Sequence, residues 1–516
     1  MKSRLCIAFP ILLLAAACGG KEPETAVRQP AVKVDIVAVG AYDARITVRS
    51  AFCSEIVWSC APDGPSGTET GLDETVAGKE TELFIQGLAP LSTYTFSATG
   101  RNREGKESSP QQVSFSTTVG PDGLYPWESR RSAPLPVADM TLVSRGQHRA
   151  NPPAWTPERF ASHVFYTDEQ GEGHWFFDSF LCIEGYDGVR GRTFSIQPTG
   201  HSATRESWEE LLDYWFAPEG ALKALDDAVG KAASTLGPPP FPRQVIMAVP
   251  DPIMFETFGD KQSSTSYWGS IDGVRMDFSR TDHQLKAFLW YVDECRARFG
   301  ALAPKNLELL GFYVLSEELP LDPAFYGSLG LNAGSGETWN WQYKRWETLL
   351  PAAAAYLHGC REGFYWIPYY YAPGYRVWKD LGFDAVFMQP NHYWDTENQH
   401  PLSRTATALR QYGMGMELEF EYSMVSEVMR VEKTGPDGAG NMIFTEADVP
   451  ALKDRFRAYM DMFRENGFYG KHPVALYSGT DALFQLARSG DPEDRKIYHE
   501  LGRFITESPL KTASAQ

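Results

Sequence analysis

At 516 residues the chain is too long for one ordinary domain, and with 43% hydrophobic and 22% charged residues it has ample material for a core. Its formal net charge of −18 argues against nucleic-acid binding, because contacts to phosphates need a surface rich in Lys and Arg. We therefore expect two or three folded domains and no nucleic-acid partner.

Residues 1–18 have the pattern of an export signal. Lys2 and Arg4 precede the apolar run IAFPILLLAAA, which is too short to span a bilayer as a stable helix. The stretch LLLAAAC resembles the lipobox of bacterial lipoproteins, and this resemblance implies cleavage that leaves Cys18 as a lipidated N-terminus. An ordinary secretory signal with a free Cys nearby is the alternative. We expect an exported, lipid-anchored protein of the bacterial outer membrane or cell surface, with the polar residues 19–30 as its tether.

Five cysteines follow Cys18, and an odd number without tight spacing indicates neither a disulfide framework nor a CxxC metal site. They are Cys53, Cys60, Cys182, Cys295 and Cys360. Cys53 and Cys60 lie near enough in the sequence to pair, and burial of both as small hydrophobic residues is the alternative.

Residues 31–119 alternate apolar and polar residues in short runs separated by turn residues, which predicts an all-β sandwich. Within LAPLSTYTF, four residues match the L-x-P-x-S/T-x-Y pattern: Leu88, Pro90, Ser92 and Tyr94. The region resembles a fibronectin type III domain, in which Trp58 stands where an early strand supplies a core Trp. The resemblance implies a spacer or binding module, and the sequence shows no catalytic cluster in it.

The Pro-rich residues 120–139 predict a linker, and the pattern then changes. Over residues 140–512, strand-like runs alternate with amphipathic helical runs, which indicates parallel strand pairing and a closed (β/α)8 barrel of the TIM type. The predicted strands are 140–146, 174–185, 243–252, 307–318, 363–372, 384–394, 413–421 and 472–479. A doubly wound open sheet is the alternative, but no Gly-rich phosphate loop follows the first strand.

The seventh predicted strand, GMGMELEFE, carries three acids on one face. Glu417, Glu419 and Glu421 share their parity with Gly413 and Gly415, whereas the Met, Leu and Phe residues share the other. We expect the apolar set to pack against the helices and the acids to point into the barrel and toward its mouth, where barrel enzymes hold their chemistry. The two glycines would leave room in the crowded lower layer.

The fourth predicted strand ends in Glu317, whose parity also places it inward at the rim. An acid ending strand four and another ending strand seven resembles the layout of the large clan of retaining glycoside hydrolases. The resemblance implies Glu317 as the acid/base and Glu419 as the nucleophile, with Glu417 and Glu421 as close alternatives. The chain departs from that clan at Ser316, where Asn is usual, and this puts the acid assignment in question.

A structural reading competes with this one: the same acids would form a buried polar network, a cation site or a solvated rim. Burying several carboxylates together is costly unless they are paired or protonated, which weakens a purely structural role. Asp178, within FFDSF, is expected to be a buried structural acid.

Other predicted strand ends offer polar and aromatic side chains that suit the hydroxyls and flat faces of sugars. They are Gln389, Asn391, His392, Trp394, Tyr369, Tyr371, Tyr375 and Asp251. No HExxH or His-x-His pair occurs among the ten His, and YSGTD is not a G-x-S-x-G elbow. We therefore expect neither a zinc hydrolase nor a serine esterase, and no metal or cofactor.

Residues from about 125 to 510 resemble the family of domain of unknown function 4855, and GFYVLSEE, MQPNHYW and GMGMELEFE carry the likeness. The resemblance implies an exported bacterial protein with a glycosidase-like barrel. We predict a surface lipoprotein whose barrel cleaves a glycosidic bond of an oligo- or polysaccharide with retention of configuration. A non-catalytic glycan-binding protein on the same scaffold is the alternative.

Overall fold

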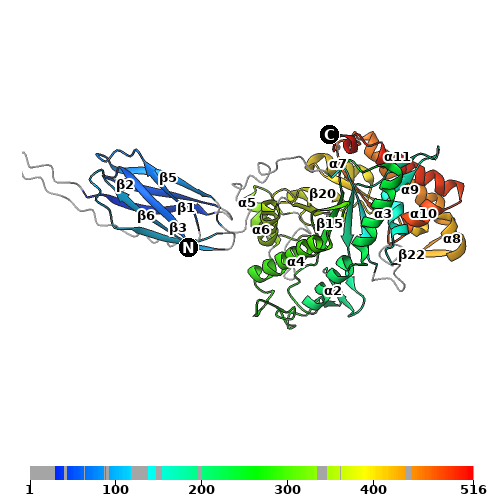
Figure 1. Cartoon of the computed structure of the whole chain (residues 1–516), viewed down its shortest axis with the longest axis horizontal. Helices are drawn as coiled ribbons and strands as arrows, with labels where there is room; N and C mark the ends of the chain where they lie inside the picture. The colour runs from blue at the N-terminus through cyan, green and yellow to red at the C-terminus, as the bar shows by residue number, and fades with distance from the viewer. Residues whose placement is uncertain are drawn as a thin grey trace, which may run out of the picture. The chain divides into compact units, whose positions relative to one another are not determined.

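A computed structural model of the chain describes residues 29–39, 43–62, 64–86, 88, 92–117, 137–146, 154–195, 200–333, 346–360, 362–436 and 443–514. The predicted signal with Cys18, most of the predicted tether, Pro90 and residues 120–136 of the predicted linker lie outside them. The chain forms two compact units, one made of β-strands up to Ser116 and one of alternating strands and helices after it (Figure 1).

The first unit consists of two antiparallel sheets, which confirms the predicted all-β character of this region. One sheet has the order β1 (Ala31–Val39), β2 (Asp43–Ala51), β5 (Ala77–Gln86). The other has the order β4 (Ser66–Thr70), β3 (Glu55–Ala61), β6 (Thr93–Arg101), β7 (Gln111–Ser116). Alternate apolar residues of both sheets form one buried core.

Cys53 and Cys60 belong to that core as free thiols, so the predicted alternative of a disulfide between them is wrong. The Cys53 thiol donates instead to the carbonyl of Ala51, at 3.2 Å. Trp58 is half-buried and packs on Phe96, with ring centroids 6.0 Å apart. Both cysteines therefore act as small hydrophobic residues.

The second unit is a closed barrel of eight parallel strands, so the open-sheet alternative is wrong. The strands are β8 (Asp139–Ser144), β11 (Ser179–Ile183), β15 (Arg243–Val249), β18 (Leu307–Val314), β19 (Gly363–Trp366), β20 (Ala385–Met388), β21 (Gly415–Glu419) and β24 (Val474–Tyr477). They follow one another around the barrel in chain order, and β24 pairs with β8 to close it. Each of the eight predicted strands contains one of these strands or overlaps it.

Each of the eight observed strands is shorter than its predicted range. Residues 173–175 form β10 (Gly173–Trp175), which pairs antiparallel with β9 (Phe165–Thr167) outside the barrel. At the other end, the apolar runs continue past β18, β19 and β20 into the loops that cover the mouth. Hydrophobic runs do not mark where a strand ends when the following loop is buried as well.

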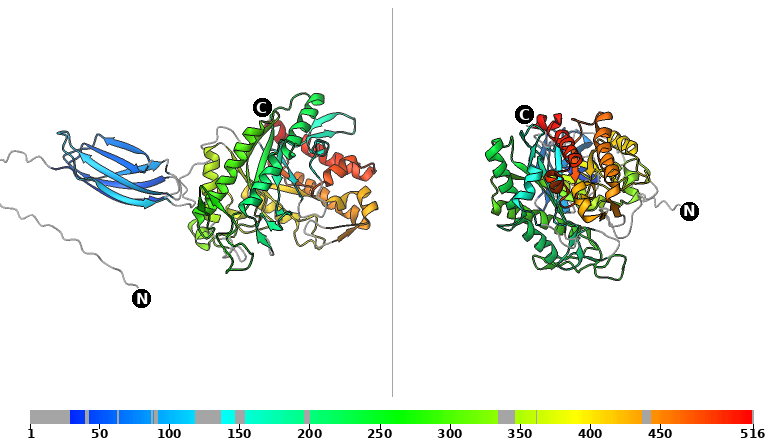
Figure 2. Two further views of the ribbon diagram at one scale, coloured as in Figure 1. Left: turned by 60° about the horizontal axis from the view of Figure 1, so that its bottom comes forward. Right: turned by 90° about the vertical axis from the view of Figure 1, so that its right-hand side faces the viewer.

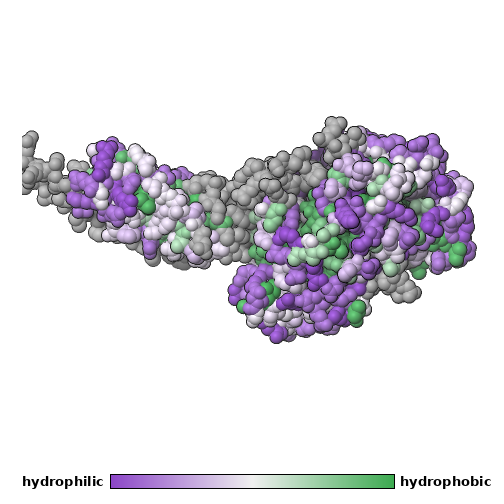
Figure 3. Space-filling view, in the orientation of Figure 1, coloured by the Kyte–Doolittle hydropathy of each residue, from purple (hydrophilic) through white to green (hydrophobic). Residues whose placement is uncertain are grey.

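Helices surround the strands (Figures 1 and 2). They are α1 (Pro157–Val164), α2 (Arg205–Phe216), α3 (Ala221–Leu236), α4 (Thr281–Leu302), α5 (Pro323–Ser328), α6 (Trp346–Gly359), α7 (Leu402–Tyr412), α8 (Ser426–Glu432), α9 (Val449–Glu465), α10 (Ala482–Arg488), α11 (Pro492–Thr506) and α12 (Pro509–Ser514). Their apolar stripes join the strands in one large core, while the outer face seen in Figure 3 is mostly hydrophilic. None of the helices described here combines the length and the apolar character needed to cross a bilayer.

Short elements fill the connections between the barrel strands and helices. The small strands are β12 (Tyr186–Asp187), β13 (Arg192–Thr193), β14 (His201–Ser202), β16 (Ser270–Ile271), β17 (Val274–Arg275), β22 (Thr434–Pro436) and β23 (Ile443–Thr445). The 3₁₀ segments are η2 (Tyr375–Val377), η3 (Tyr422–Met424) and η4 (Glu446–Asp448). A long insertion, with η3, α8, β22, β23 and η4, follows β21, the strand that carries the predicted acids.

Two glycines of the barrel allow strands to approach closely. A Cβ on Gly311 would lie 2.2 Å from the carbonyl oxygen of Gly363 on the neighbouring strand β19. A Cβ on Gly415 would lie 2.4 Å from the carbonyl oxygen of Pro473. Gly413 has a different role from the predicted one: it ends α7 in the left-handed conformation, with φ of 68°, and lies outside β21.

A buried ionic cluster closes the base of the barrel, where the strands begin. Arg243, fully buried, forms an ion pair with Asp178 just before β11, at 2.5 Å. Lys511 of α12 reaches Asp139 at 2.8 Å and Asp178 at 3.1 Å. Asp178 is 1% exposed, so the structure places this acid in a paired structural cluster, as the sequence analysis expects.

Candidate active site

Strand β21 directs its acids into the barrel. The ring of Phe420, which follows the strand, packs against Phe456 of the outer helix α9 with centroids 5.0 Å apart. Residues of that parity therefore face the helices, and Glu417 and Glu419 face the interior. Glu417 is 2% exposed and Glu419 is fully buried.

Glu421 lies two residues past the end of β21 and is held by the neighbouring strand. Its Oε1 accepts a hydrogen bond from the Tyr477 hydroxyl at 2.7 Å. A Cβ on Gly479 would lie 2.3 Å from its Oε2, so the absence of a side chain there makes room for this carboxyl. Glu421 is thus packed against the β24 side of the mouth.

Glu317 follows β18 and is exposed to solvent at the rim. Nearby protein atoms that displace water, and the negative charge of Glu318, raise the pKa of Glu317 to about 7. Water reaches this exposed side chain and moderates the rise of its pKa. Ser316 turns its hydroxyl back to the carbonyl of Glu318, at 3.1 Å, and so stabilises the turn instead of offering a group to the mouth.

The carboxyls from β18 and β21 influence one another across the mouth. Burial raises the pKa of Glu417 well above its usual range, and the charges of Glu419 and Glu317 add to the rise. Burial also raises the pKa of Glu419 to about 8, with Glu317 adding to it. In the described parts of the chain, no Lys, Arg or His forms an ion pair with these three carboxyls. The group therefore retains protons at neutral pH.

Polar groups from two other parts of the barrel oppose the rise of the pKa of Glu419. The Tyr459 hydroxyl donates a hydrogen bond to Glu419 Oε2, and the side chain of Gln389 and the backbone of Asn391 also lower the pKa. Among the described residues, the Tyr459 hydroxyl forms a hydrogen bond with Glu419 Oε2. The Oε1 atoms of Glu419 and Glu417 are buried and have no hydrogen-bond partner there. Glu419 thus has one oxygen fixed and one available.

The loops after β19 and β20 bring further predicted residues to this group. Asn391 donates from Nδ2 to the Tyr369 hydroxyl at 3.1 Å. Its φ of 56° is in the left-handed region, which Asn tolerates better than most residues. Tyr369 is half-buried, and the charges of Glu317 and Glu419 contribute to the rise of its pKa after burial. Tyr369, Gln389 and Asn391 therefore lie beside the acids.

His392 and Trp394 are half-buried in the same loop. Burial and the charge of Arg455 lower the pKa of His392, so its ring is neutral at neutral pH. His392 Nδ1 and Trp394 Nε1 have no hydrogen-bond partner within the described residues. Trp394 also makes an edge contact with Tyr477, with centroids 5.9 Å apart. Both side chains can offer polar atoms to a ligand.

The remaining predicted residues divide between the site and its surroundings. Asp251, after β15, is 5% exposed and raises the pKa of Tyr313 together with Glu317 and Glu417, so it faces the same interior. Tyr371 donates its hydroxyl proton to the carbonyl of Arg404 at 2.6 Å, under the Arg404 guanidinium. Tyr371 is therefore engaged with α7, away from the acids.

Tyr375 is buried and packs on Tyr371 and Tyr412, with ring centroids 5.2 and 5.3 Å apart. It is a core residue. Tyr459, Tyr477 and Tyr313 also contact or face the acids, and no sequence pattern singles them out. Of these, Tyr459 bonds Glu419 itself. It lies on the apolar face of an amphipathic helix with Phe456 and Phe463, where nothing distinguishes it from a core aromatic.

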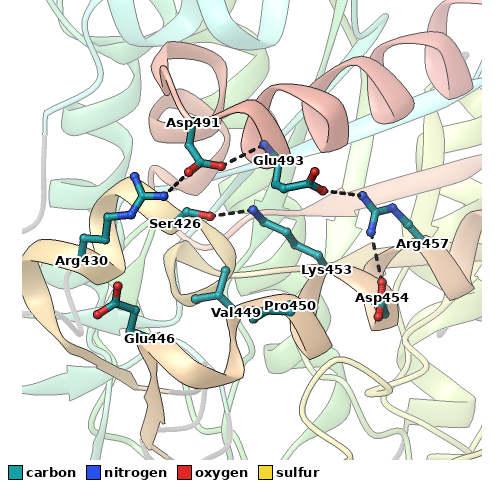
Figure 4. A pocket seen from close by; sticks show the side chains of 10 residues that line it. All are labelled: Ser426, Arg430, Glu446, Val449, Pro450, Lys453, Asp454, Arg457, Asp491 and Glu493. Carbon is teal, nitrogen blue, oxygen red and sulfur yellow. Dashed lines mark hydrogen bonds and ion pairs between the residues drawn. The ribbon is translucent and has the colours of Figure 1, made fainter.

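A separate cavity of about 350 Å³ lies beside α8, α9 and α11 (Figure 4). Its charged groups pair with neighbours around its wall: Arg430 with Asp491, Lys453 with Ser426 and Asp494, and Arg457 with Asp454 and Glu493. None of the predicted site residues lines it. Across the described stretches of the chain, no three His, Cys, Asp or Glu side chains are placed to hold a metal ion.

The fold and the mouth together define a (β/α)8 barrel protein with a carboxyl-rich site at the C-terminal ends of its strands. Residues 139–325 and 335–435 match the family described as Domain of unknown function (DUF4855). These stretches make up more than half of the chain, which therefore belongs to that family.

Matches to solved structures are distant. Chitinase ChiW from Paenibacillus sp. str. FPU-7 is 8% identical, with 94% of this chain and 41% of that chain covered and a TM-score of 0.31. Lactobacillus rhamnosus β-glucuronidase is 8% identical, with 93% and 68% covered and a TM-score of 0.32. The fibronectin type-III domain of human fibronectin type III domain containing protein 3 is 17% identical, with 19% and 92% covered and a TM-score of 0.13. At these TM-scores the likenesses carry no weight for function, and no curated protein matches the chain.

Proposed function

We propose that the protein hydrolyses a glycosidic bond of an oligo- or polysaccharide, with Glu317 and Glu419 as its reacting carboxyls. The observation that carries this proposal is the placement of Glu417 and Glu419, buried on β21, near Glu317, which follows β18 at the same barrel mouth. Glycosidic cleavage needs one carboxyl that gives a proton and another that is ionised. Coupled carboxyls without a neutralising cation divide protons in this way.

The surroundings of each acid support its role. Glu317 is exposed and its pKa is raised, so it can hold a proton for the leaving oxygen and recover it from water. Glu419 receives a hydrogen bond from Tyr459, which favours the ionised form. Burial, joined by the charges of Glu419 and Glu317, raises the pKa of Glu417, so Glu417 keeps the extra proton and leaves the negative charge to Glu419.

Retention of configuration follows if Glu419 attacks the sugar directly, which needs carboxyls about 5–5.5 Å apart. Tyr369, Gln389, Asn391, His392, Trp394 and Asp251 are the proposed contacts to sugar hydroxyls and ring faces. Glu421, engaged by Tyr477, is the less suitable nucleophile. No cofactor enters this mechanism.

The test is hydrolysis of a panel of oligosaccharides by the wild type, Glu317→Gln and Glu419→Gln. Each variant should lose activity by a factor of about 10²–10⁴ or more while keeping its fold, because an amide can neither give the proton at position 317 nor attack as a carboxylate at position 419. Glu397→Gln, an exposed acid in the loop after β20, is the matched control and should keep full activity. Full activity in both site variants would overturn the proposal, and NMR of the first product would show retention or inversion.

A glycan-binding protein without catalysis is the second candidate. It is favoured by the half-buried Trp394 and His392, whose ring nitrogens lack partners among the described residues. Binding of a glycan that the wild type never cleaves, and that Glu419→Gln binds equally well, would decide for this candidate.

We also propose that the chain is exported and anchored by a lipid on Cys18, at the bacterial outer membrane or cell surface. The lipobox-like LLLAAAC supports this. A fibronectin type III-like spacer is proposed for the first unit, supported by its three- and four-stranded sheets and by buried Leu88 and Tyr94. Cys18→Ala should move the protein from the membrane fraction to the soluble fraction, and continued membrane association would refute the anchor.

A further inference from the structure

Helix α9 sends a polar group through the barrel wall to the acids. Tyr459 of α9 is fully buried, and its hydroxyl donates to Glu419 Oε2. Strand β20 makes this possible because its last paired residue, Met388, lies opposite Met416. Beyond Met416, β21 has no strand neighbour on that side, so a side chain from outside can reach the acid.

The hydrogen bond from Tyr459 has a fixed direction. The Tyr459 oxygen accepts the backbone N–H of Tyr393 at 2.7 Å. Burial and the charge of Glu419 raise the Tyr459 pKa well above its usual range, so the phenol keeps its proton wherever the carboxyls titrate. With the oxygen already accepting a bond, the hydroxyl proton points to Glu419. The contact is therefore a donor to a carboxylate, which is the stronger form of such a bond.

Several groups act on the pKa of Glu419, and the hydrogen bond from Tyr459 is first among those that favour the ionised form. The titratable groups facing it come from four elements: Glu417 of β21, Glu317 after β18, Tyr369 after β19 and Tyr459 of α9. The carboxyls repel a second negative charge. Among the groups that oppose the effect of burial, the Tyr459 hydroxyl comes first, ahead of Asn391 and Gln389.

We infer that Tyr459 is a positioning residue that fixes Glu419 Oε2 and leaves Oε1 as the attacking oxygen; this inference rests on the proposed function. Oε1 forms a bond to the anomeric carbon while the bond from that carbon to the leaving oxygen breaks, and Glu317 gives its proton to that oxygen. Water then attacks the anomeric carbon, returns a proton to Glu317, and the bond to Oε1 breaks. Oε1 accepts no hydrogen bond from the described residues, so its lone pairs are not committed to another group.

Tyr459→Phe tests the inference because it removes the hydroxyl alone. The acid dissociation constant of Glu419, followed by NMR of protein carrying ¹³C-labelled Glu, should fall about 10- to 100-fold. In kinetics, kcat should fall by a similar factor with KM nearly unchanged, and the acidic limb of the pH–rate profile should move to higher pH. An unchanged acid dissociation constant for Glu419 would overturn the inference even where the protein hydrolyses glycans.

Tyr166→Phe is the matched control, because Tyr166 is also a buried tyrosine, 1% exposed, whose hydroxyl forms a hydrogen bond. Its partner is His499 Nδ1, at 3.1 Å, and not one of the acids. This variant should lose about as much stability as Tyr459→Phe, while the acid dissociation constant of Glu419 stays unchanged. If Tyr459→Phe fails to fold, 3-fluorotyrosine at position 459 keeps the hydroxyl and makes it a stronger donor, so the acid dissociation constant of Glu419 should rise. A wild type that cleaves no glycan, with Glu419 still responding to Tyr459→Phe, would refute the proposed function and leave the contact established.

Discussion

Two groups of acids are buried at opposite ends of the same barrel, and they differ in what neutralises them. At the base, Asp178 forms an ion pair with Arg243, and Asp139 forms one with Lys511. At the mouth, the charged neighbours of the β18 and β21 carboxyls are other carboxyls. Arg and Lys side chains thus form ion pairs with the acids at the base, whereas in the described residues no cation pairs with the carboxyls at the mouth.

The difference separates acids whose burial is offset by a buried or half-buried cation from acids whose burial is not. Burial raises the pKa of Asp139 to about 6, with Lys511 opposing the rise, whereas the pKa of Glu419 reaches about 8. Unpaired buried carboxyls lower stability and are retained where a protein uses them. In barrel proteins the base serves stability and the mouth holds the chemistry.

The largest expected effect breaks the base. Arg243→Met should lower the free energy of unfolding of the barrel by about 3–5 kcal/mol, because it leaves Asp178 buried without its Arg partner. Urea unfolding followed by Trp fluorescence measures it. Lys223→Met, which removes an exposed ion pair with Asp227, is the control and should change stability by less than about 1 kcal/mol. A loss that small in Arg243→Met would mean that Lys511 alone neutralises Asp178.

The second prediction is a gain in stability: removal of an acid at the mouth should stabilise the barrel, whereas Arg243→Met at the base should destabilise it. As a coupled pair, Glu417 and Glu419 share protons in the folded state that the unfolded chain releases above about pH 4.5. Stability should therefore fall as the pH rises from about 4.5 through about 8. Glu417→Gln removes one of these groups, so it should stabilise the barrel at pH 8, by less than Arg243→Met destabilises it, and change its stability little below about pH 4.5.

Urea unfolding at several pH values checks this, with Glu397→Gln as an exposed control whose difference from the wild type should stay near zero. Equal stability of Glu417→Gln and the wild type at pH 8 would show that Glu417 is solvated or paired after all. Together the two variants sharpen the comparison: Arg243→Met should destabilise the barrel at its base, and Glu417→Gln should stabilise it at its mouth.

The barrel strands could be predicted because each is a local pattern of apolar residues between amphipathic helices. The inward direction of Glu417 and Glu419 follows from the same local property, since parity within a strand fixes the face. The partners that distinguish the two ends are not local. Lys511 meets Asp139 across 372 residues, and Tyr459 meets Glu419 from a helix whose sequence reads as core.

Other differences have equally physical causes. Gly413 reads as the first residue of a strand but caps α7, because glycine suits the left-handed end of a helix as well as a crowded strand. Ser316 stands at the position of the usual Asn, and only the structure shows its hydroxyl bonded to the turn. Sequence patterns thus locate the acids, while the protonation of each acid depends on contacts that no pattern contains.

The smallest expected effect concerns recognition at the mouth. Tyr369 is half-buried, and its hydroxyl accepts a hydrogen bond from Asn391 Nδ2. Tyr369→Phe should raise KM about 3- to 10-fold with a smaller change in kcat, because a lost polar contact to a sugar is worth about 0.5–1.5 kcal/mol. At the base, Ser179→Ala removes a comparable bond from Ser179 to Gln244 Oε1, at 3.0 Å, and should lower stability by about 1 kcal/mol with KM unchanged. If both variants changed KM alike, the mouth would not be the place where the sugar binds, and the contrast between the two ends would lose its functional meaning.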